Sequence, residues 1–421
     1  MPDRDVDVLI VGAGAAGSAC AEALVRDRSF DGSVLLVGRE QDPPYERPPA
    51  SKDYLRGETD RAGTYLHPAD WYASQGVELL LRTSVMKLDT EARVAKLSNK
   101  EEVGYGACVL ATGANVRRLR VPGAELEGIH YLRALGNSDA IRADAEAASR
   151  VVLVGGSYIA CEVAASLTAL GKQCTMVMIE DAPLSTHFGP QVAAYVAELL
   201  RSRGVELVCG DPLAGFVGDT QTASPSGTGG RVGSVETESG RLVDADLVVM
   251  GTGAVPDVML ARSSGLSLGE TGGVACSSTL ATSAPGVWCA GDACEYDSVL
   301  HGRRMRIEHW EVARAQGKAA AAAVAGRPAD FDEVPYFWCD LADWATLEYV
   351  GSATSPDREI VRGSIDGGEF AVFYVEGARL VAALSVGRPE DLMHARRLLA
   401  AGGELGDPEV LGDPGSDLSE L

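Results

Sequence analysis

Runs of consecutive apolar residues, each ending in glycine, mark the first part of the chain. Residues 8–11 are apolar without interruption, a pattern typical of a strand buried on both faces of a parallel sheet. A glycine-rich turn and an alanine-rich run at 15–25 follow, so the predicted order is strand, turn, helix. The same order returns at 151–171. The chain therefore contains two copies of one α/β unit.

The remaining pattern extends these units and then changes. Apolar runs at 33–37, 174–179 and 245–250 predict further strands of parallel sheets. From about 334 to 384, short strand-like runs separated by turn residues dominate, and a helix at 389–401 follows them. This part predicts a small third domain of antiparallel strands with one helix.

The length of the chain predicts the number of domains, and two segments without a periodic pattern are expected to lie outside regular structure. At 421 residues the chain is long enough for two to four domains. Residues 219–233 are rich in Gly, Ser and Thr, and we expect a flexible surface excursion there. The acidic residues 403–421 are expected to be a disordered tail.

The first glycine turn has the spacing of a dinucleotide-binding loop. Gly12 permits the sharp turn, Gly14 lets backbone approach a pyrophosphate, and Gly17 lets the helix pack close to the strand. The helix then presents unpaired N–H groups and a partial positive charge to the phosphates. A plain glycine turn is the alternative, but the strand before it and the helix after it favour a nucleotide. The predicted fold class is therefore α/β with Rossmann-like domains.

The second glycine turn departs from this spacing. Gly155 is kept, but Ser157 and Ala160 replace the middle and last glycines, and only alanine at the last position is a common variant. The chain thus binds two dinucleotides, or one beside a decayed copy of the site. The following strand ends at Glu180 with no arginine just after it. Such a free carboxylate favours a ribose 2′-hydroxyl, so we expect NADH rather than NADPH.

Two further residues near the first unit are candidates for ligand contacts. The second strand ends in Gly38-Arg39-Glu40, and Glu40 is our candidate for the ribose hydroxyl, although Arg39 stands where the acid could equally have been. Four prolines at 43–49 exclude a regular helix and form a rigid loop that leads to Lys52. Lys52 is either aimed at a ligand or solvated on a surface loop.

Asp292 and Trp310 also have two interpretations each. Asp292 follows the buried strand at 287–290 and either accepts a hydrogen bond from a ligand near its phosphates or caps a helix. Trp310 stands at the start of an alanine-rich helix at 312–325, where its flat face either covers a ring or belongs to the core.

Composition narrows the possible partners. The net charge of −23 disfavours nucleic acid and is explained by solubility. Local arginine clusters at 117–120, 303–306 and 396–397 stand out as docking points for a small acidic protein, and we expect Arg303, Arg304 and Arg306 to form that patch.

The apolar segments, the first residues and the cysteines predict where the protein is located in the cell. The chain has no run of 18 apolar residues, so we expect no membrane association, and its first residues lack a basic and apolar leader, so we expect a cytoplasmic protein. Nine scattered cysteines without a C-x-x-C pair suggest neither a disulfide framework nor a zinc site. We expect them to be small buried side chains in a reducing compartment.

Together these residues resemble the FAD-dependent ferredoxin and rubredoxin reductases that serve oxygenases, a superfamily that includes apoptosis-inducing-factor-like proteins. The resemblance covers nearly the whole chain. It depends on the two glycine turns, the Pro-Tyr-Glu-Arg-Pro-Pro-Ala-Ser-Lys stretch at 44–52, Ala-Thr-Gly at 111–113, Ala-Gly-Asp at 290–292, Glu-His-Trp at 308–310 and Pro-Tyr-Phe-Trp-Cys-Asp at 335–340.

The resemblance implies a glutathione-reductase-like architecture with two Rossmann-like domains. An FAD-binding domain would be split over 1–115 and 247–326, with an NAD-binding domain at 116–246 and a C-terminal α+β interface domain at 327–402. Lys52 and Glu162 would form an ion pair beside the flavin N5, and Trp310 would stack on the nicotinamide; these three are the catalytic candidates. Arg133 and Val85 would contact the flavin and the adenine side, respectively, and Asp292 the ribityl–phosphate region.

The complete expected sites are as follows. FAD is expected at Gly12, Gly14, Ala15, Ala16, Gly17, Glu40, Arg47, Lys52, Val85, Ala111, Arg133, Gly291, Asp292 and Trp310, and NAD at Gly155, Gly156, Ser157, Tyr158, Ile159, Glu162, Glu180 and Gly253.

The implied function is electron transfer from NADH through FAD to a ferredoxin-type or rubredoxin iron–sulfur protein, by a monomer or weak homodimer. Two alternatives remain. A flavin disulfide reductase needs a reactive cysteine after the second strand, and 43–55 contains none. A signalling protein of the apoptosis-inducing-factor type would favour a basic surface, which the net charge of −23 opposes.

Overall fold

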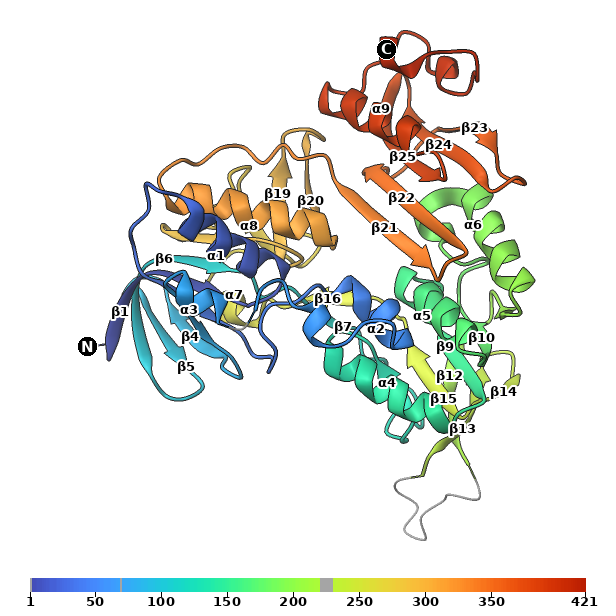
Figure 1. Cartoon of the computed structure of the whole chain (residues 1–421), viewed down its shortest axis with the longest axis horizontal. Helices are drawn as coiled ribbons and strands as arrows, with labels where there is room; N and C mark the ends of the chain where they lie inside the picture. The colour runs from blue at the N-terminus through green and yellow to red at the C-terminus, as the bar shows by residue number, and fades with distance from the viewer. Residues whose placement is uncertain (1, 69, 220–229) are drawn as a thin grey trace.

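Three large sheets organise the chain in the computed structural model, which describes residues 2–68, 70–219 and 230–421. Each sheet belongs to one domain, and the chain leaves the first domain for the second and returns to it before it builds the third (Figure 1). The surface excursion expected at 219–233 lies mostly outside the described residues.

The first domain is built on a seven-stranded sheet. Its N-terminal elements are β1 (Arg4–Val11), α1 (Ala15–Arg26), β2 (Val34–Val37), η1 (Pro48–Ser51), α2 (Asp53–Arg56), η2 (Ala62–Thr64), α3 (Trp71–Ser74), β3 (Val77–Leu80), β4 (Val85–Asp89), β5 (Val94–Leu97) and β6 (Glu102–Leu110). After the second domain come α7 (Met259–Ser263), β17 (Val274–Cys276), β18 (Val287–Cys289), β19 (Cys294–Ser298), β20 (Arg303–Arg306) and α8 (Trp310–Val324).

The order of this sheet is β3-β2-β1-β6-β5-β4, and β18 also pairs with β6. Strands β3, β2, β1, β6 and β18 run parallel, which explains why β1 is apolar throughout its buried half: it has a neighbour on each edge and is covered on its faces. Helices α1 and α8 pack against each other, and Gly317 permits this because a Cβ there would lie 2.1 Å from the Ala16 carbonyl oxygen. Strands β17, β19 and β20 form a separate small sheet.

The second domain has a five-stranded parallel sheet in the order β11-β10-β9-β15-β8. Its elements are β8 (Ile129–Tyr131), α4 (Leu135–Ala147), β9 (Arg150–Val154), α5 (Tyr158–Ala169), β10 (Gln173–Val177), α6 (Ser185–Ser202), β11 (Glu206–Val208), β12 (Leu213–Gly218), β13 (Val232–Thr237), β14 (Leu242–Asp244) and β15 (Leu247–Met250). Strands β7 (Ala114–Val116) and β16 (Ala254–Pro256) pair antiparallel where the chain crosses between the two domains.

One expected boundary is wrong. The first domain was expected to resume at residue 247, but 247–250 form β15, which lies between β9 and β8 of the second sheet. An apolar strand looks the same in either sheet, so the sequence pattern could not assign it. The return to the first domain follows β16 instead.

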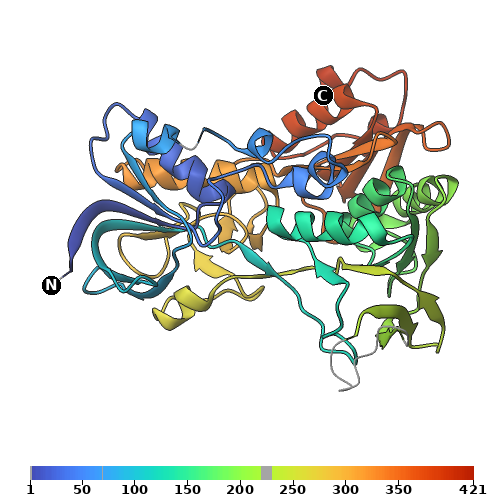
Figure 2. The ribbon, with the colours of Figure 1, turned by 60° about the horizontal axis from the view of Figure 1, so that its bottom comes forward.

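The C-terminal domain is an antiparallel sheet in the order β21-β22-β25-β24-β23 with one helix. Its elements are β21 (Tyr336–Leu341), β22 (Ala345–Gly351), β23 (Arg358–Ser364), β24 (Glu369–Glu376), β25 (Arg379–Val386), α9 (Pro389–Ala400), η3 (Pro408–Leu411) and η4 (Leu418–Glu420). Figure 2 shows this domain at the upper right of the view, above the second domain.

The disordered tail expected at 403–421 is also a wrong prediction. Leu411 and Leu418 are buried in the C-terminal core, and Arg362 and Arg397 donate hydrogen bonds to carbonyl oxygens of the tail. The acidic composition of the tail predicted disorder. The two buried leucines are too far apart in the sequence to form a periodic apolar pattern.

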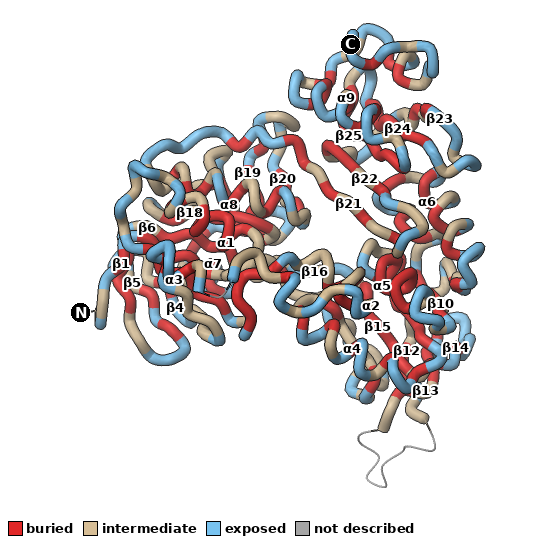
Figure 3. The backbone as a smooth tube through the Cα atoms, viewed as in Figure 1, coloured by how far each residue is buried: buried red, intermediate tan, exposed pale blue. Residues whose placement is uncertain are grey.

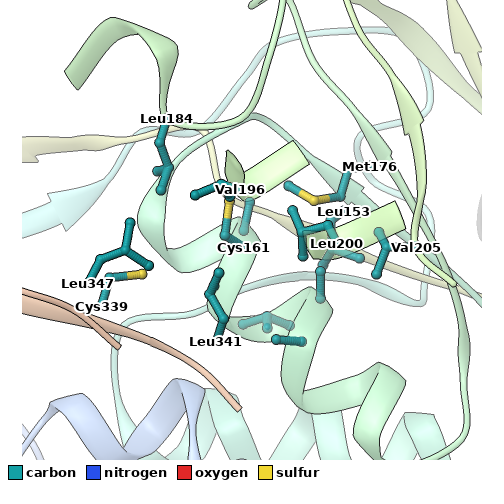
Figure 4. Close-up of a cluster of buried hydrophobic side chains, with 14 of the residues drawn as sticks. Leu153, Cys161, Met176, Leu184, Val196, Leu200, Val205, Cys339, Leu341 and Leu347 are labelled. Carbon is teal, nitrogen blue, oxygen red and sulfur yellow. The ribbon is translucent and has the colours of Figure 1, made fainter. Parts of the chain in front are cut away.

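A shared core joins the second and third domains. Cys339, Leu341 and Leu347 of the C-terminal sheet pack against Cys161 of α5 and Leu184 (Figure 4). Figure 3 shows the buried stretches continuing through α5, β21 and β22. This packing fixes the start of β21 at the junction of all three domains, where the functional site lies.

Candidate functional site

Both glycine turns open onto one cavity of about 1090 Å³. Every residue predicted to bind FAD or NAD lines this cavity except Gly17 and Gly156. Gly17 is a packing residue, as its spacing predicts, because a Cβ there would lie 1.8 Å from the Gly12 carbonyl oxygen. Gly156 lies behind the second turn, where a Cβ would lie 3.1 Å from Glu180 Oε2.

The two turns are built alike. Gly12 has a φ of +112°, and a Cβ there would lie 2.1 Å from the carbonyl oxygen of Ala111. Gly155 has a φ of +109°, and a Cβ there would lie 2.4 Å from the carbonyl oxygen of Gly251. Both positions therefore require glycine for conformation and for close packing against the end of the neighbouring strand.

The first turn leaves room for a phosphate. A Cβ on Gly14 would meet only the Arg47 guanidinium, at 3.9 Å. Gly14 is the N-cap of α1, and no side chain occupies the first backbone N–H groups of that helix. Open space, free N–H donors and a nearby cation together fit a pyrophosphate.

Ser157 fits the second turn without obstructing it. Its hydroxyl donates to the Gly251 carbonyl oxygen at 2.7 Å and accepts from the Ala160 N–H as the N-cap of α5. The side chain that replaces the middle glycine is thus used within the protein, which removes the objection raised by the sequence.

Of the two candidates for the ribose acid, the geometry favours Glu40. Its carboxylate accepts hydrogen bonds from Tyr45 Oη at 2.6 Å and Arg47 Nη2 at 2.9 Å. Burial alone would raise the pKa of Glu40, but Arg47 and the Tyr45 hydroxyl lower it, so the carboxylate stays ionised. Arg39 turns to Asp257 at 2.9 Å and to Asn115 at 2.7 Å.

Lys52 and Glu162 meet as the resemblance implies, and Asp340 joins them. Lys52 Nζ lies 3.3 Å from Glu162 Oε1 and 3.1 Å from Asp340 Oδ2, and it lies over the ring of Trp338. The Ser51 hydroxyl donates to Glu162 Oε2 at 2.5 Å. Side-chain exposure is 10% for Lys52 and 6% for Glu162. Three domains therefore supply one buried charge cluster.

One ammonium serves two carboxylates in this cluster. Burial alone would lower the pKa of Lys52, but Glu162 and Asp340 raise it above its ordinary value, so Lys52 stays charged. Burial raises the pKa of Glu162, and Lys52 and Ser51 oppose this effect only in part. Glu162 is more deeply buried than Asp340, and one cation does not fully offset the cost of removing its charge from water.

Asp292 acts as a cavity residue and not as a helix cap. Its carboxylate accepts from Arg133 Nη2 at 2.8 Å, and Arg47 donates to the Arg133 carbonyl oxygen. The preceding Gly291 has a φ of +80° and donates its N–H to the Gln316 side chain at 2.8 Å. These contacts hold the turn rigidly against the cavity.

Trp310 is the first residue of α8, lines the cavity and is half-buried. It joins none of the apolar clusters formed by the described residues, so the interpretation as a core tryptophan fails. His309 beside it packs against the Phe337 ring, with centroids 4.4 Å apart and the ring planes tilted by 37°, and also lines the cavity.

Two buried polar atoms have no hydrogen-bond partner among the described residues and line this cavity. They are Glu180 Oε2, three residues after the end of β10, and His309 Nδ1. An unpaired buried carboxylate oxygen is costly, and a ribose hydroxyl is the partner that it lacks. The residues present therefore fit FAD at the first turn and a pyridine dinucleotide at the second.

Asp340 and His309 are site residues that the sequence pattern did not single out. Both lie in motifs that carry the resemblance, yet only the packing of β21 shows that Asp340 reaches Lys52. The docking patch expected from Arg303, Arg304 and Arg306 stays a prediction, although Arg304 pairs with Asp297 at 2.9 Å and Arg306 pairs with Glu308 within the chain. Arg303 donates to the Ser352 hydroxyl at 3.1 Å.

His309 provides a pH prediction. Burial lowers its pKa to about 4, whereas an unfolded histidine titrates near 6.5. Between these values the unfolded state binds more protons, so stability falls as the pH falls, by about 2 kcal/mol at pH 5. In thermal unfolding of the FAD-loaded protein, His309→Gln should therefore lose less stability between pH 7 and pH 5 than the wild type. Equal losses would mean that the folded imidazole protonates freely.

Comparisons with known proteins identify the family of the chain. The chain matches the pyridine nucleotide-disulphide oxidoreductase model over residues 6–317 and the reductase C-terminal model over residues 336–421. It is 32% identical to rhodocoxin reductase of Rhodococcus erythropolis, over 98% of this chain and 93% of the relative. It is 35% identical to the ferredoxin–NAD(+) reductase component of the anthranilate 1,2-dioxygenase system of Burkholderia cepacia, over 96% and 97% of the two chains.

A solved structure extends the similarity to three dimensions. The covalent putidaredoxin reductase–putidaredoxin complex superposes with a TM-score of 0.91 at 32% identity, over 100% of this chain and 98% of that chain. The chain belongs to the pyridine nucleotide-disulphide oxidoreductase family, in its branch of FAD-dependent ferredoxin reductases. Its cofactors are FAD and a pyridine nucleotide. No helix among the described residues is long and apolar enough to cross a membrane.

Proposed function

We propose that this protein transfers electrons from NADH, through FAD, to a small iron–sulfur protein of the ferredoxin or rubredoxin type that serves an oxygenase. One observation carries the proposal: two nucleotide-binding turns open onto the same cavity, with the Lys52–Glu162–Asp340 cluster at its wall. Residues 43–55 contain no cysteine, so disulfide reduction lacks its reactive group. The named relatives, a rhodocoxin reductase and the ferredoxin–NAD(+) reductase component of a dioxygenase system, support the same activity.

Bound flavin supplies the conversion of a two-electron hydride donor into single-electron steps, and the protein supplies position and charge. Gly12, Gly14 and the start of α1 bind the FAD pyrophosphate, and Glu40 and Asp292 orient its ribose and ribityl hydroxyls. Glu180 orients the NADH ribose. Lys52 would hold a fixed positive charge at the wall of the cavity that receives the ring system.

The proposal is tested by cytochrome c reduction with NADH, in the presence and absence of a purified bacterial [2Fe–2S] ferredoxin. Turnover should depend on the ferredoxin and saturate with it. Turnover that is negligible with every ferredoxin and rubredoxin offered, in a protein that still forms a tight charge-transfer complex with NADH, would contradict the proposal and indicate a switch protein.

Glu180 decides the choice of nucleotide in this proposal. Glu180→Gln removes the charge and keeps the shape, so the KM for NADH should rise about 10-fold or more, because a charge-assisted hydrogen bond to the ribose is lost. The KM for NADPH should change little or fall. Glu206→Gln is the control, because that carboxylate lies on β11 and pairs with Arg241 on the surface. Equal effects on the two nucleotides would remove Glu180 from the site.

The cysteines support a cytoplasmic location in this proposal. All nine are free, and eight of them are buried. Thiols of this kind are kept reduced in the cytoplasm.

A further inference from the structure

Three cysteines form a cluster that the proposed electron transfer does not use. Cys276 ends β17, Cys289 ends β18 and Cys294 begins β19. Their Sγ atoms all lie within 4.8 Å of one another. Exposure is 1% for Cys276 and 0% for each of the other two. Three thiols from three strands thus converge on one point in the interior of the first domain.

This separation matches trigonal coordination by sulfur. With a metal–sulfur distance of about 2.3 Å, three sulfurs around one ion lie about 4 Å apart, so the cluster needs only small adjustments to hold one. The group that could hold an ion consists of these three cysteines alone, among the residues that the structure describes. Structural zinc takes four ligands in most proteins, whereas soft thiolates in a dry site select copper in its +1 state.

We propose that Cys276, Cys289 and Cys294 form a binding site for a single thiophilic monovalent ion, Cu(I), held by three sulfur ligands beneath the flavin-side turn.

Two hydrogen bonds at Cys276 hold this part of the cluster in place. The Cys276 thiol donates to the Val274 carbonyl oxygen at 3.3 Å. The Arg304 guanidinium donates to the Cys276 carbonyl oxygen at 3.3 Å and also pairs with Asp297. Each new copper–sulfur bond replaces an S–H bond, whose proton passes to solvent, and no electron is transferred.

The cluster lies next to a turn that lines the proposed FAD site, so binding of an ion would affect that turn. Cys289 and Cys294 bracket the turn of Ala290, Gly291 and Asp292, and the Cys294 N–H donates to the Gly291 carbonyl oxygen at 2.8 Å. An ion that ties β17, β18 and β19 together therefore braces this turn from behind. Binding to the folded state alone raises its stability, so the thermal midpoint should rise when the ion is added.

The test uses the reduced, FAD-loaded protein under anaerobic conditions. Cu(I) is added in the presence of a chromophoric Cu(I) chelator that competes for it. The wild type should withdraw one equivalent of Cu(I) from the chelator. It should also gain near-ultraviolet thiolate-to-copper absorption and unfold at a higher temperature. Cys294→Ser should lose all three effects. Cys209→Ser, which changes a partly exposed cysteine outside the cluster, should keep them.

Two results would overturn the site. The first is failure of the wild type to compete for one equivalent of Cu(I). The second is binding that survives in Cys294→Ser or disappears in Cys209→Ser. X-ray absorption of the copper-loaded wild type covers the case in which Cys294→Ser does not fold: a shell of three sulfurs supports the site, and a shell of nitrogen or oxygen contradicts it. Flavin content is measured in the same samples, so failure of this site is distinguishable from failure of the electron-transfer proposal.

Discussion

Replacing Gly12 with alanine is expected to give a protein that does not retain FAD. The added Cβ would lie 2.1 Å from the Ala111 carbonyl oxygen, and the φ of +112° strains any residue other than glycine. Relief requires the turn to move away from β6, which also moves the N–H groups that bind the pyrophosphate. FAD affinity should therefore fall by at least about 100-fold. The measurements are the ratio of flavin to protein after gel filtration and FAD titration of the apoprotein.

Two alanine variants sharpen this experiment. Gly136→Ala adds a Cβ that meets nothing within 4 Å, so flavin content should equal that of the wild type. Gly155→Ala creates the corresponding clash in the second turn, so this protein should keep its flavin and lose its response to NADH. A Gly12→Ala protein that purifies with a full complement of flavin would show that the first turn is not the FAD site.

Replacing Lys52 with methionine is expected to slow flavin reduction by NADH about 100-fold, the size of effect seen when one preorganised electrostatic group is removed from a site. Methionine fills a similar volume without charge and leaves Glu162 and Asp340 facing each other without a cation. The rate constant is measured by anaerobic stopped-flow absorbance of the flavin band, with the affinity for NADH obtained from its concentration dependence.

Lys96→Met is the matched control, because Lys96 is half exposed and pairs only with Glu102 at the surface. Its reduction rate should not change. If Lys52→Met reduces at the wild-type rate, the buried cluster is structural and Lys52 has no part in the reaction. Asp340→Asn separates positioning from charge: it should slow reduction less than Lys52→Met, because Glu162 still holds the ammonium.

The sequence predicted the parts of this molecule that depend on local pattern. The run at 8–11 followed by Gly12 and Gly14 predicts the first strand, turn and helix, because backbone conformation and close packing allow few alternatives there. The second turn followed in the same way, and Glu180 follows β10 and lines the cavity, although the strand ends at Val177, earlier than expected.

What the sequence could not predict depends on contacts between distant segments. The strand at 247–250 joins the second sheet because of its neighbours β9 and β8, which its own apolar residues do not specify. Asp340 reaches Lys52 only because β21 packs on α5. The three cluster cysteines looked like scattered small side chains, since their spacing of 12 residues (276 to 289) and four residues (289 to 294) matches no metal motif.

The central claim is that one cavity brings NADH against FAD. It is tested most directly by anaerobic titration of the purified protein with NADH, followed through the visible flavin absorbance. The account predicts a yellow protein whose flavin band bleaches with one equivalent of NADH and returns when an oxidised [2Fe–2S] ferredoxin is added. A protein that contains no flavin and cannot be reconstituted with it, or a flavin band that NADH leaves unchanged, would contradict the account.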